Sequence, residues 1–386
     1  MTSIRTDFYP DGSLRTIHFT NIHGSHRIDG PSSQSWYANG QIWFQHCCIN
    51  GKRNNFFDTY TNQIIPAYQH WNSGGQIWFQ HYYTNGKLNN LFDTNTNQTI
   101  PAIQEWFTGG QLYYQQYYTN GKRNNFFNTN TNHTIPAFQE WHNNGKIWSQ
   151  EYYTNDKRNN FFDTYANQTI PARQEWHKNG QLQIQKYYIG DKLNNFFNHE
   201  TNQTIPATQE WFTNGQLQIQ QYYINGEYNN FFNHENNQTI PAIQHWNSGG
   251  QLKYQGYYTN DECNNFFDTN TNQIIPATQD WHNNGQLFYQ FYYINSRLNN
   301  FFDINTNQTI PAVQYWHNDG QPYSQRYHIN DCNISHTHFT TLCYILPYYI
   351  KKYLHKIHSH NKLKAQAEHL AMQEYISVLP VLSPTT

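Results

Sequence analysis

Charged residues are scarce in this chain. Asp, Glu, Lys and Arg together make up 12% of its 386 residues, and the net charge is −2. So small a net charge produces no overall field that could gather phosphate backbones, and we therefore predict that nucleic acid is not a partner. Aromatic residues, by contrast, make up 18% of the chain. Low charge with abundant aromatics is not the composition of a disordered protein.

Cysteine is also scarce, and its spacing fits neither a disulfide framework nor a metal site. The five cysteines are Cys47, Cys48, Cys263, Cys332 and Cys343. They show no CxxC or other ligand spacing, and any disulfide scheme leaves one of them unpaired. A reducing, intracellular environment is the simplest interpretation. We predict no metal site and no cofactor.

Long apolar runs are missing as well. The N-terminal sequence MTSIRTDFYPDGSLRTIHF contains no apolar run long enough for a signal peptide. The longest apolar run, LCYILPYYI from Leu342, is too short to span a bilayer and contains a proline. We therefore predict an intracellular, cytoplasmic protein without a transmembrane segment.

The sequence is dominated by one repeat. Tryptophan recurs at 35-residue steps, at Trp36, Trp71, Trp106, Trp141, Trp176, Trp211, Trp246, Trp281 and Trp316. The unit reads IPAxQxWxxNGQLxxQxYYxNGKxNNFFDTNTNQT. A period of this size predicts a tandem array in which each repeat rests on its neighbours. We predict a divergent N-terminal repeat or cap at residues 1–30, nine repeats at 31–330, and a C-terminal helical cap or tail at 331–386.

Two turn signals in each repeat predict β-hairpins. Asn-Gly, Gly-Gly or Asp-Gly after the tryptophan accepts the positive φ of a tight hairpin turn, and Asn120-Gly121 marks a second turn. We expect three antiparallel strands per repeat, closed by the polar loop DTNTNQT and restarted by Ile-Pro. Such repeats, joined without helices, predict an all-β, elongated antiparallel meander, either a ribbon or a solenoid. At roughly 4.8 Å per strand, equivalent residues would lie about 14 Å apart.

One face of the first strand is constant between copies and the other varies. Ala102, Gln104 and Trp106 alternate with the variable positions, which is the period of a strand. We predict that the nine tryptophans form a packing ladder on the constant side of the ribbon. The predicted partner-binding face lies at the variable positions Tyr68, Ile103, Phe138 and Arg173.

The run W-x-x-N-G-Q-[LI]-x-x-Q-x-Y-Y-x-N-G-K resembles the variant form of the MORN repeat, the membrane occupation and recognition nexus family. That variant alternates two NG turns, as Gly110 and Gly121 do here, and the resemblance covers the nine repeats and residues 8–30. Asn124-Asn125 stands where the family has glycine, and the loop DTNTNQTIPA lengthens a unit of about 23 residues to 35. Both departures leave the strand register after the second hairpin open.

The resemblance implies a non-enzymatic scaffold for protein–protein interaction or self-association. MORN arrays are sometimes associated with membranes, and bacterial variant arrays are similar to antitoxin components. Long Asn-, Ile- and Tyr-rich arrays of this kind also look like gene products of large DNA viruses. Catalysis normally needs one asymmetric arrangement of side chains, whereas this chain repeats the same residues in every unit. We therefore predict no catalytic residue. The alternative is a ligand-binding array similar to choline- or glucan-binding repeats, which build hairpins from Trp, Tyr and NG turns.

A basic ladder follows the second turn in the N-terminal half of the array. It consists of Lys52, Lys87, Lys122, Lys157 and Lys192. Such a row could bind the phosphates of lipid or RNA, and cross-strand pairing with glutamate explains it equally well. Because the same position holds Glu227 and Glu262 further along, we expect the N-terminal half to be the anion-binding half.

The composition changes near Asn330. Pro347 marks a helix start, and the spacing that follows predicts two short helices or one bent helix. This segment could cover the last strand edge of the array. It could instead make peripheral membrane contact as a basic amphipathic anchor through Lys351, Lys352, Lys356, Lys362 and Lys364.

A glycosylation sequon recurs in the polar loop of the repeat. It stands at Asn97, Asn132, Asn167, Asn202, Asn237 and Asn307. These sites would carry glycans only in a secreted protein, and a loop rich in Asn and Thr produces the motif by composition alone.

Overall fold

The computed structural model describes residues 2–303, 306 and 308–334, so the predicted C-terminal helices and all but the first four residues of the predicted cap or tail lie outside this range. The described chain consists of β-strands and turns. No helix within it is long and apolar enough to cross a bilayer. The chain divides into two compact parts, one formed by Met1–Phe231 with Pro241–Leu252 and the other by Phe232–Ile240 with the described residues from Lys253 onward.

Each repeat folds into three successive hairpins. In the repeat of Trp106, β16 (Ile103–Trp106) and β17 (Leu112–Gln116) form the main hairpin, which joins a long antiparallel sheet. The turn hairpin, β18 (Tyr118–Thr119) and β19 (Lys122–Arg123), and the projecting hairpin, β20 (Phe126–Asn128) and β21 (His133–Ile135), each form a separate two-stranded sheet.

The prediction of a three-stranded repeat is therefore wrong, because only two strands of each repeat enter the main sheet. After the second turn, β19 pairs with β18 and not with a strand of the main sheet. The chain then forms the projecting hairpin, and the polar loop is the tip of that hairpin. Two strands per repeat place equivalent residues about 10 Å apart along the sheet, rather than 14 Å.

The main sheet of the first part is antiparallel and follows the order of the chain. Its strands are β1 (Ser3–Phe8), β2 (Leu14–Asn21), β4 (Ser33–Trp36), β5 (Ile42–His46), β10 (Tyr68–Trp71), β11 (Ile77–His81), β16, β17, β22 (Phe138–Trp141), β23 (Ile147–Glu151), β28 (Arg173–Trp176), β29 (Leu182–Lys186), β34 (Thr208–Trp211), β35 (Leu217–Gln221) and β40 (Ile243–Trp246). The short strand β3 (Gly24–Ser25) pairs with the end of β2.

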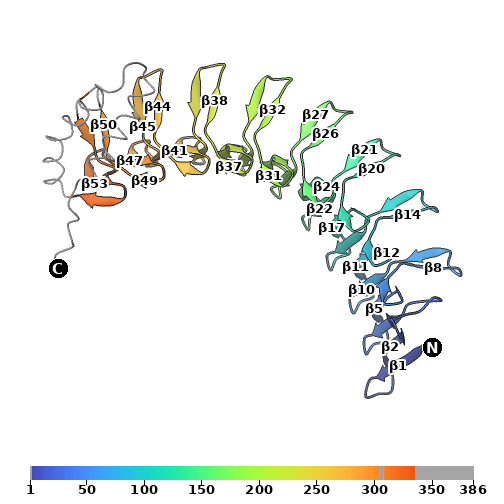
Figure 1. Cartoon of the computed structure of the whole chain (residues 1–386). Helices are drawn as coiled ribbons and strands as arrows, with labels where there is room; N and C mark the ends of the chain where they lie inside the picture. Colours follow the sequence, from blue (N-terminus) through green and yellow to red (C-terminus); the bar gives the residue numbers. More distant parts are fainter. Residues whose placement is uncertain (1, 304–305, 307, 335–386) are drawn as a thin grey trace. The chain divides into compact units, whose positions relative to one another are not determined.

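The first part carries turn hairpins and projecting hairpins along this sheet. The other turn hairpins are β6 (Cys48–Ile49) with β7 (Lys52–Arg53), β12 (Tyr83–Thr84) with β13 (Lys87–Leu88), β24 (Tyr153–Thr154) with β25 (Lys157–Arg158), β30 (Tyr188–Ile189) with β31 (Lys192–Leu193), and β36 (Tyr223–Ile224) with β37 (Glu227–Tyr228). The other projecting hairpins are β8 (Phe56–Asp58) with β9 (Gln63–Ile65), β14 (Leu91–Asp93) with β15 (Gln98–Ile100), β26 (Phe161–Asp163) with β27 (Gln168–Ile170), and β32 (Phe196–Asn198) with β33 (Gln203–Ile205). Figure 1 shows these projecting hairpins on one side of the sheet.

The second part has the same organisation. Its main sheet contains β41 (Leu252–Gly256), β46 (Thr278–Trp281), β47 (Leu287–Phe291), β52 (Val313–Trp316), β53 (Pro322–Ile329) and β54 (Cys332–Ile334). Its turn hairpins are β42 (Tyr258–Thr259) with β43 (Glu262–Cys263) and β48 (Tyr293–Ile294) with β49 (Arg297–Leu298). Its projecting hairpins are β38 (Phe231–Asn233) with β39 (Gln238–Ile240), β44 (Phe266–Asp268) with β45 (Gln273–Ile275), and β50 (Phe301–Asp303) with β51 (Gln308–Ile310).

A bulge ends the pairing in each main hairpin. Between β16 and β17, Glu105 lies opposite Tyr114, whereas the next residue, Trp106, lies opposite Leu112. Tyr113 is therefore the extra residue, and such a bulge redirects its side chain. The turn itself closes at Gly110, whose φ of 79° suits glycine.

Glutamine side chains connect the main hairpins on one face of the sheet, which we call the glutamine face. Gln104 lies opposite Gln115 in the register of β16 and β17. The Nε2 of Gln115 donates to Oε1 of Gln139 in the next repeat at 2.8 Å, and that of Gln80 donates to Gln104 at 2.7 Å. A net gain of about 1 kcal/mol per hydrogen bond helps fix the register, because a one-residue slip would turn every glutamine to the other face.

The most buried side chains are small or aromatic. Ala102 and its equivalents are fully buried, and the Tyr117 position is nearly so. The ring of Tyr117 stacks on Phe126 with the centroids 5.2 Å apart, and the Tyr117 N–H donates to the Ala137 carbonyl of the next repeat at 2.8 Å. Trp106, like the other tryptophans of the ladder, is half-buried at the end of its strand, so the packing role of the ladder stays a prediction.

The Asn-Asn pair sets the register that the sequence left open. Oδ1 of Asn125 accepts from the N–H of Ala137 in the following segment at 3.1 Å and from the N–H of Tyr153 in the next repeat at 2.9 Å. Oδ1 of Asn124 accepts from the Asn155 N–H at 2.8 Å. These side chains bridge main-chain groups that have no strand partner, and they tie each turn hairpin to the next one.

Candidate functional site

The four predicted partner-binding positions lie on the face of the main sheet opposite to the glutamine face, which we call the variable face. Tyr68, Ile103, Phe138 and Arg173 are the first residues of β10, β16, β22 and β28. They are half-buried or buried, because residues of the flanking strands cover them: Tyr68, for example, lies opposite both His46 and His81. The sheet therefore holds these four side chains in fixed positions.

The bulge adds exposed aromatic rings to the variable face. The extra residue is Trp43, Trp78, Tyr113 or Trp148 in successive repeats, and Trp43 and Trp78 are 39% and 50% exposed. His70 lies between the first two indoles, with ring centroids at 5.5 Å from Trp43 and 5.7 Å from Trp78. Sequence reasoning missed this row, because strand alternation places these residues on the other face.

The N-terminal end of the variable face is an aromatic and histidine patch. The ring of Tyr68 lies 4.2 Å from that of His46 and 5.7 Å from that of His81, and His70 stacks on Phe79 at 4.9 Å. The buried Nε2 atoms of His46 and His81 and the Nδ1 atom of His70 have no hydrogen-bond partner. Burial, aided by nearby Arg53, lowers the pKa of His46 and that of His81 to about 4.

This patch predicts a loss of stability in acid. Between pH 6.5 and 4, His46 and His81 bind protons in the unfolded chain, where their pKa values are near 6.5, but stay neutral in the folded chain. The stability that these two histidines contribute is therefore fully present above about pH 6.5 and is lost as the pH falls toward 4. We expect a decrease on the order of 1 kcal/mol per histidine between pH 7.5 and 4.5 in urea unfolding. His46→Gln/His81→Gln should flatten this profile, since Gln116 and Gln221 occupy the same position in other repeats. Parallel profiles would contradict the assignment.

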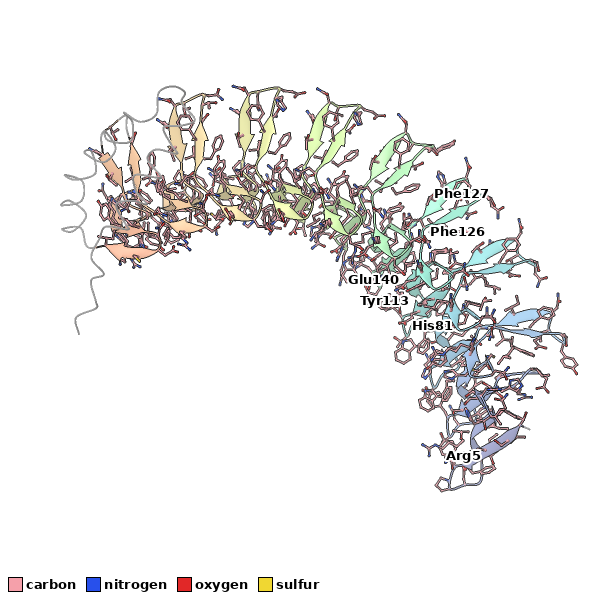
Figure 2. The ribbon with its side chains drawn as sticks, viewed as in Figure 1. Arg5, His81, Tyr113, Phe126, Phe127 and Glu140 are labelled. Carbon is pink, nitrogen blue, oxygen red and sulfur yellow. The ribbon has the colours of Figure 1, made fainter. Side chains whose placement is uncertain are left out.

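The middle of the variable face combines tyrosines with carboxylates. The Tyr114 hydroxyl donates to Glu105 at 2.5 Å, and Tyr113 hydrogen-bonds to Glu140 of the next repeat, which raises the pKa of Tyr113 to about 12. Burial raises the pKa of Glu140 above its ordinary value. Figure 2 shows Tyr113 and Glu140 on the sheet, away from Phe127 on the projecting hairpin.

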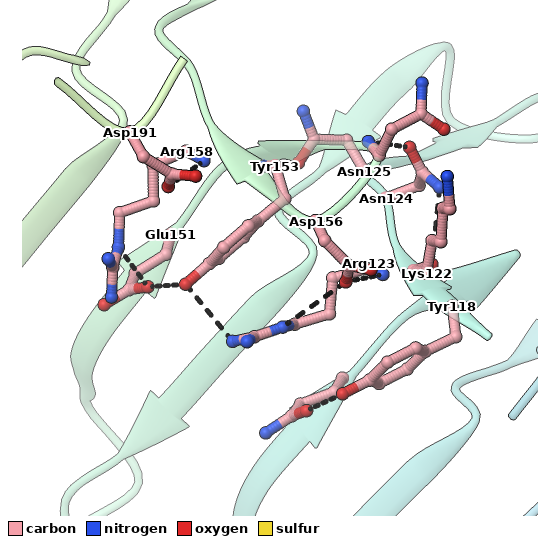
Figure 3. Close-up of polar contacts among 12 residues, drawn as sticks. Tyr118, Lys122, Arg123, Asn124, Asn125, Glu151, Tyr153, Asp156, Arg158 and Asp191 are labelled. Carbon is pink, nitrogen blue, oxygen red and sulfur yellow. Dashed lines mark hydrogen bonds and ion pairs between the residues drawn. The ribbon is translucent and has the colours of Figure 1, made fainter. Parts of the chain in front are cut away.

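A charge network follows in the next repeats (Figure 3). Glu151, which is 7% exposed, accepts from Nε of Arg158 at 3.1 Å and from the Tyr153 hydroxyl, and it lies 3.5 Å from Nε of Arg173. Nε of Arg173 also donates to Glu175 at 2.7 Å. Burial, together with Glu151, raises the pKa of Tyr153. Arg173, a predicted partner-binding residue, is thus already paired within the sheet.

In the second part of the chain, the equivalent positions of the variable face carry tyrosine, phenylalanine and glycine residues. Tyr289 and Phe291 stack with ring centroids 4.7 Å apart. A Cβ atom at Gly256 would come within 2.9 Å of the Tyr254 hydroxyl and 2.8 Å of the Tyr258 ring, so those rings occupy the space that a larger residue fills elsewhere. Side chains thus change from repeat to repeat on a backbone that stays the same.

Two other rows lie off the variable face. In the projecting hairpins from β8 to β44, the second residue is a phenylalanine that is about half exposed, as at Phe92 and Phe127, whereas the residue before it can pack on the core, as Phe126 does on Tyr117. The predicted anion-binding lysines are all exposed, one in each of five successive turn hairpins.

No set of side chains in the described ranges has the character of a metal centre. Among residues 2–303, 306 and 308–334, no group of three or more His, Cys, Asp or Glu residues is placed to hold a metal ion. The carboxylates before the tryptophans, Glu105 and Glu140 among them, repeat about 10 Å apart along the sheet, which is the distance set by two strands.

Comparison with known proteins confirms the family resemblance in two segments. Residues 137–155 and 207–225 match the family model of the MORN repeat variant. Each segment begins at the buried alanine before the main hairpin and ends in the second turn, so the matched length contains the main hairpin and the first strand of the turn hairpin. The Asn-Asn pair and the projecting hairpin lie outside both matches.

The other comparisons carry little. No curated protein matches the chain. Among solved structures, the crystal structure of TcdB2-TccC3 without the hypervariable C-terminal region is 11% identical over 86% of this chain, with a TM-score of 0.12. This chain spans 18% of the length of that protein, and a TM-score so low carries no argument about fold.

Proposed function

We propose that this chain is a non-enzymatic repeat scaffold whose variable face binds a protein partner or a second copy of the chain. The match to the MORN repeat variant supports a scaffold in general terms. One observation carries the finer proposal: the glutamine face repeats the same residues in successive repeats, whereas the variable face changes from an aromatic and histidine patch to tyrosine with carboxylate and then to arginine with glutamate. A surface that changes on a constant backbone can select a partner and fix its register.

The test compares matched variants in native affinity capture from the cells that produce the protein. Trp43→Gln/Trp78→Gln removes exposed aromatics and places glutamine where Gln183 and Gln218 stand in other repeats. Phe92→Gln/Phe127→Gln is the control on the projecting hairpins. We expect a stoichiometric protein, or a second copy of the chain, to be lost from the first variant and retained by the second. Retention by both variants, or loss from the control alone, would count against the proposal.

A second candidate function is binding of choline or a glucan. The exposure of Trp43 and Trp78 on either side of His70 supports it, because open aromatic rings can receive a cationic headgroup or a sugar ring. Retention of the chain on choline or glucan resin, released by free ligand and lost in Trp43→Gln/Trp78→Gln, would favour this candidate over the scaffold.

A further inference from the structure

The five exposed lysines of the turn hairpins form a surface separate from the variable face. We call this surface the lysine column, and it consists of Lys52, Lys87, Lys122, Lys157 and Lys192. Within β19, Arg123 donates to the Tyr153 hydroxyl on the variable face (Figure 3). Adjacent residues of a strand point to opposite faces, so Lys122 points away from that face. The column belongs entirely to the first part of the chain.

Contacts between successive repeats fix the spacing of the column. The Gly121 N–H donates to the Leu88 carbonyl at 2.9 Å, which ties one turn hairpin to the strand before it. A Cβ atom at Gly121 would lie 3.5 Å from Cβ of Lys87, and Gly86 and Gly226 lie in the same way against the stems of Lys52 and Lys192. With two main-sheet strands per repeat, the charges recur about every 10 Å. The column is therefore an ordered row of cations rather than a set of unrelated surface lysines.

The lysines of the column are not neutralised by ion pairs within the described ranges. Among the described residues, no carboxylate lies within ion-pair distance of any of the five lysines. The two aspartates in these turns keep their charge, and both bind to the preceding turn hairpin: Asp156 accepts from the Arg123 N–H at 2.7 Å, and Asp191 accepts from the Arg158 N–H at 2.8 Å. The row ends at Glu227, which is exposed at the equivalent position in the next repeat. A cationic row of defined length complements an anionic chain.

We propose that the lysine column binds an extended acidic polypeptide, a run of Glu and Asp in a partner protein. The cross-strand partners of the lysines are Ile49, Thr84, Thr119, Thr154 and Ile189, none of which offers a ring for stacking nucleic-acid bases. Lysine is a flexible point charge that can pair with a single carboxylate without the planar, bidentate geometry that arginine favours. An extended chain places every third residue about 10 Å apart, so about 13 acidic residues span the column.

The test uses the full chain and a fluorescent oligoglutamate of about 15 residues, titrated at low salt and at about 0.15 M salt. Lys87→Glu/Lys122→Glu/Lys157→Glu changes the column, and Lys146→Glu/Lys178→Glu/Lys253→Glu makes the same change of net charge at exposed positions outside it. We expect the column variant to lose about tenfold or more in affinity and the control about twofold, both losses shrinking as salt rises. Equal losses in the two variants would overturn the proposal.

A gain-of-affinity variant keeps the test independent of any folding defect. Glu227→Lys extends the column by one step and should raise oligoglutamate affinity about twofold to threefold. An unchanged or lower affinity would contradict the proposal. Column-dependent binding of single-stranded DNA or phosphatidylserine vesicles without binding of oligoglutamate would also overturn it. Because Trp43→Gln/Trp78→Gln leaves the column intact, its undiminished oligoglutamate binding separates this proposal from that of the variable face.

Discussion

Replacement of Tyr117 by Ala is expected to destabilise its repeat by about 3–5 kcal/mol, the range for removal of a large aromatic side chain from a packed core. Tyr117 is 4% exposed and stacks on Phe126, and burial raises its pKa to about 12. The array has no single large core, so the loss should be concentrated in this repeat and its immediate neighbours. Hydrogen exchange of peptides from β16 to β23 measures it as a local loss of protection.

Two variants provide the controls for Tyr117→Ala. Tyr117→Phe keeps the ring and removes a hydroxyl that receives only a 3.5 Å contact from Gln115, so it should cost less than about 1 kcal/mol. Phe127→Ala removes a half-exposed ring from the projecting hairpin and should cost about as little. If Phe127→Ala were as damaging as Tyr117→Ala, the assignment of the core to the tyrosine row would fail.

Replacement of Asn125 by Ala should be the next most damaging change, at about 2–4 kcal/mol. The side-chain oxygen accepts from two main-chain N–H groups, those of Ala137 and Tyr153, and each buried donor left without a partner costs about 1–3 kcal/mol. Since Tyr153 belongs to the next repeat, we expect protection to fall in β24 and β25 as well as in β20 and β21. The measurement is again hydrogen exchange, resolved by repeat.

Asn125→Asp is the matched control, because it retains an acceptor oxygen at the same place. We expect it to preserve most of the coupling between the two repeats, with exchange closer to the wild type than to Asn125→Ala. An Asn125→Ala protein whose next repeat exchanges normally would show that this residue does not join the repeats.

The main hairpin could be predicted from the sequence, since its signals are local. The NG turn and the alternation of Gln104 and Trp106 with variable positions place the two strands correctly. The third strand could not be predicted, because its fate depends on Asn124 and Asn125, whose partners belong to other segments and to the next repeat. A turn signal shows that the chain reverses and does not show which strand it joins.

The candidate site was predictable only in part for a related reason. Strand alternation correctly places Tyr68 and Gln69 on opposite faces of the sheet. The bulge interrupts this alternation by one residue and brings Trp78 to the variable face, beside His70. The burial and pairing of individual side chains were harder to predict from the sequence. The sequence alone suggests that Arg173 is a free surface residue. In the structure it lies against Glu151, which belongs to another strand of the sheet and stands 22 positions earlier in the chain.

The most direct test of the central claim is hydroxyl-radical footprinting of the captured complex against the free chain. Aromatic side chains report on both candidate surfaces, so the oxidation of Trp43, Trp78 and Tyr113 can be compared with that of Phe92 and Phe127 in one experiment. The scaffold account predicts that the partner protects the first three residues and leaves the two phenylalanines as reactive as in the free chain. Protection of the phenylalanines with unchanged oxidation of Trp43 and Trp78 would place binding on the projecting hairpins and contradict the account.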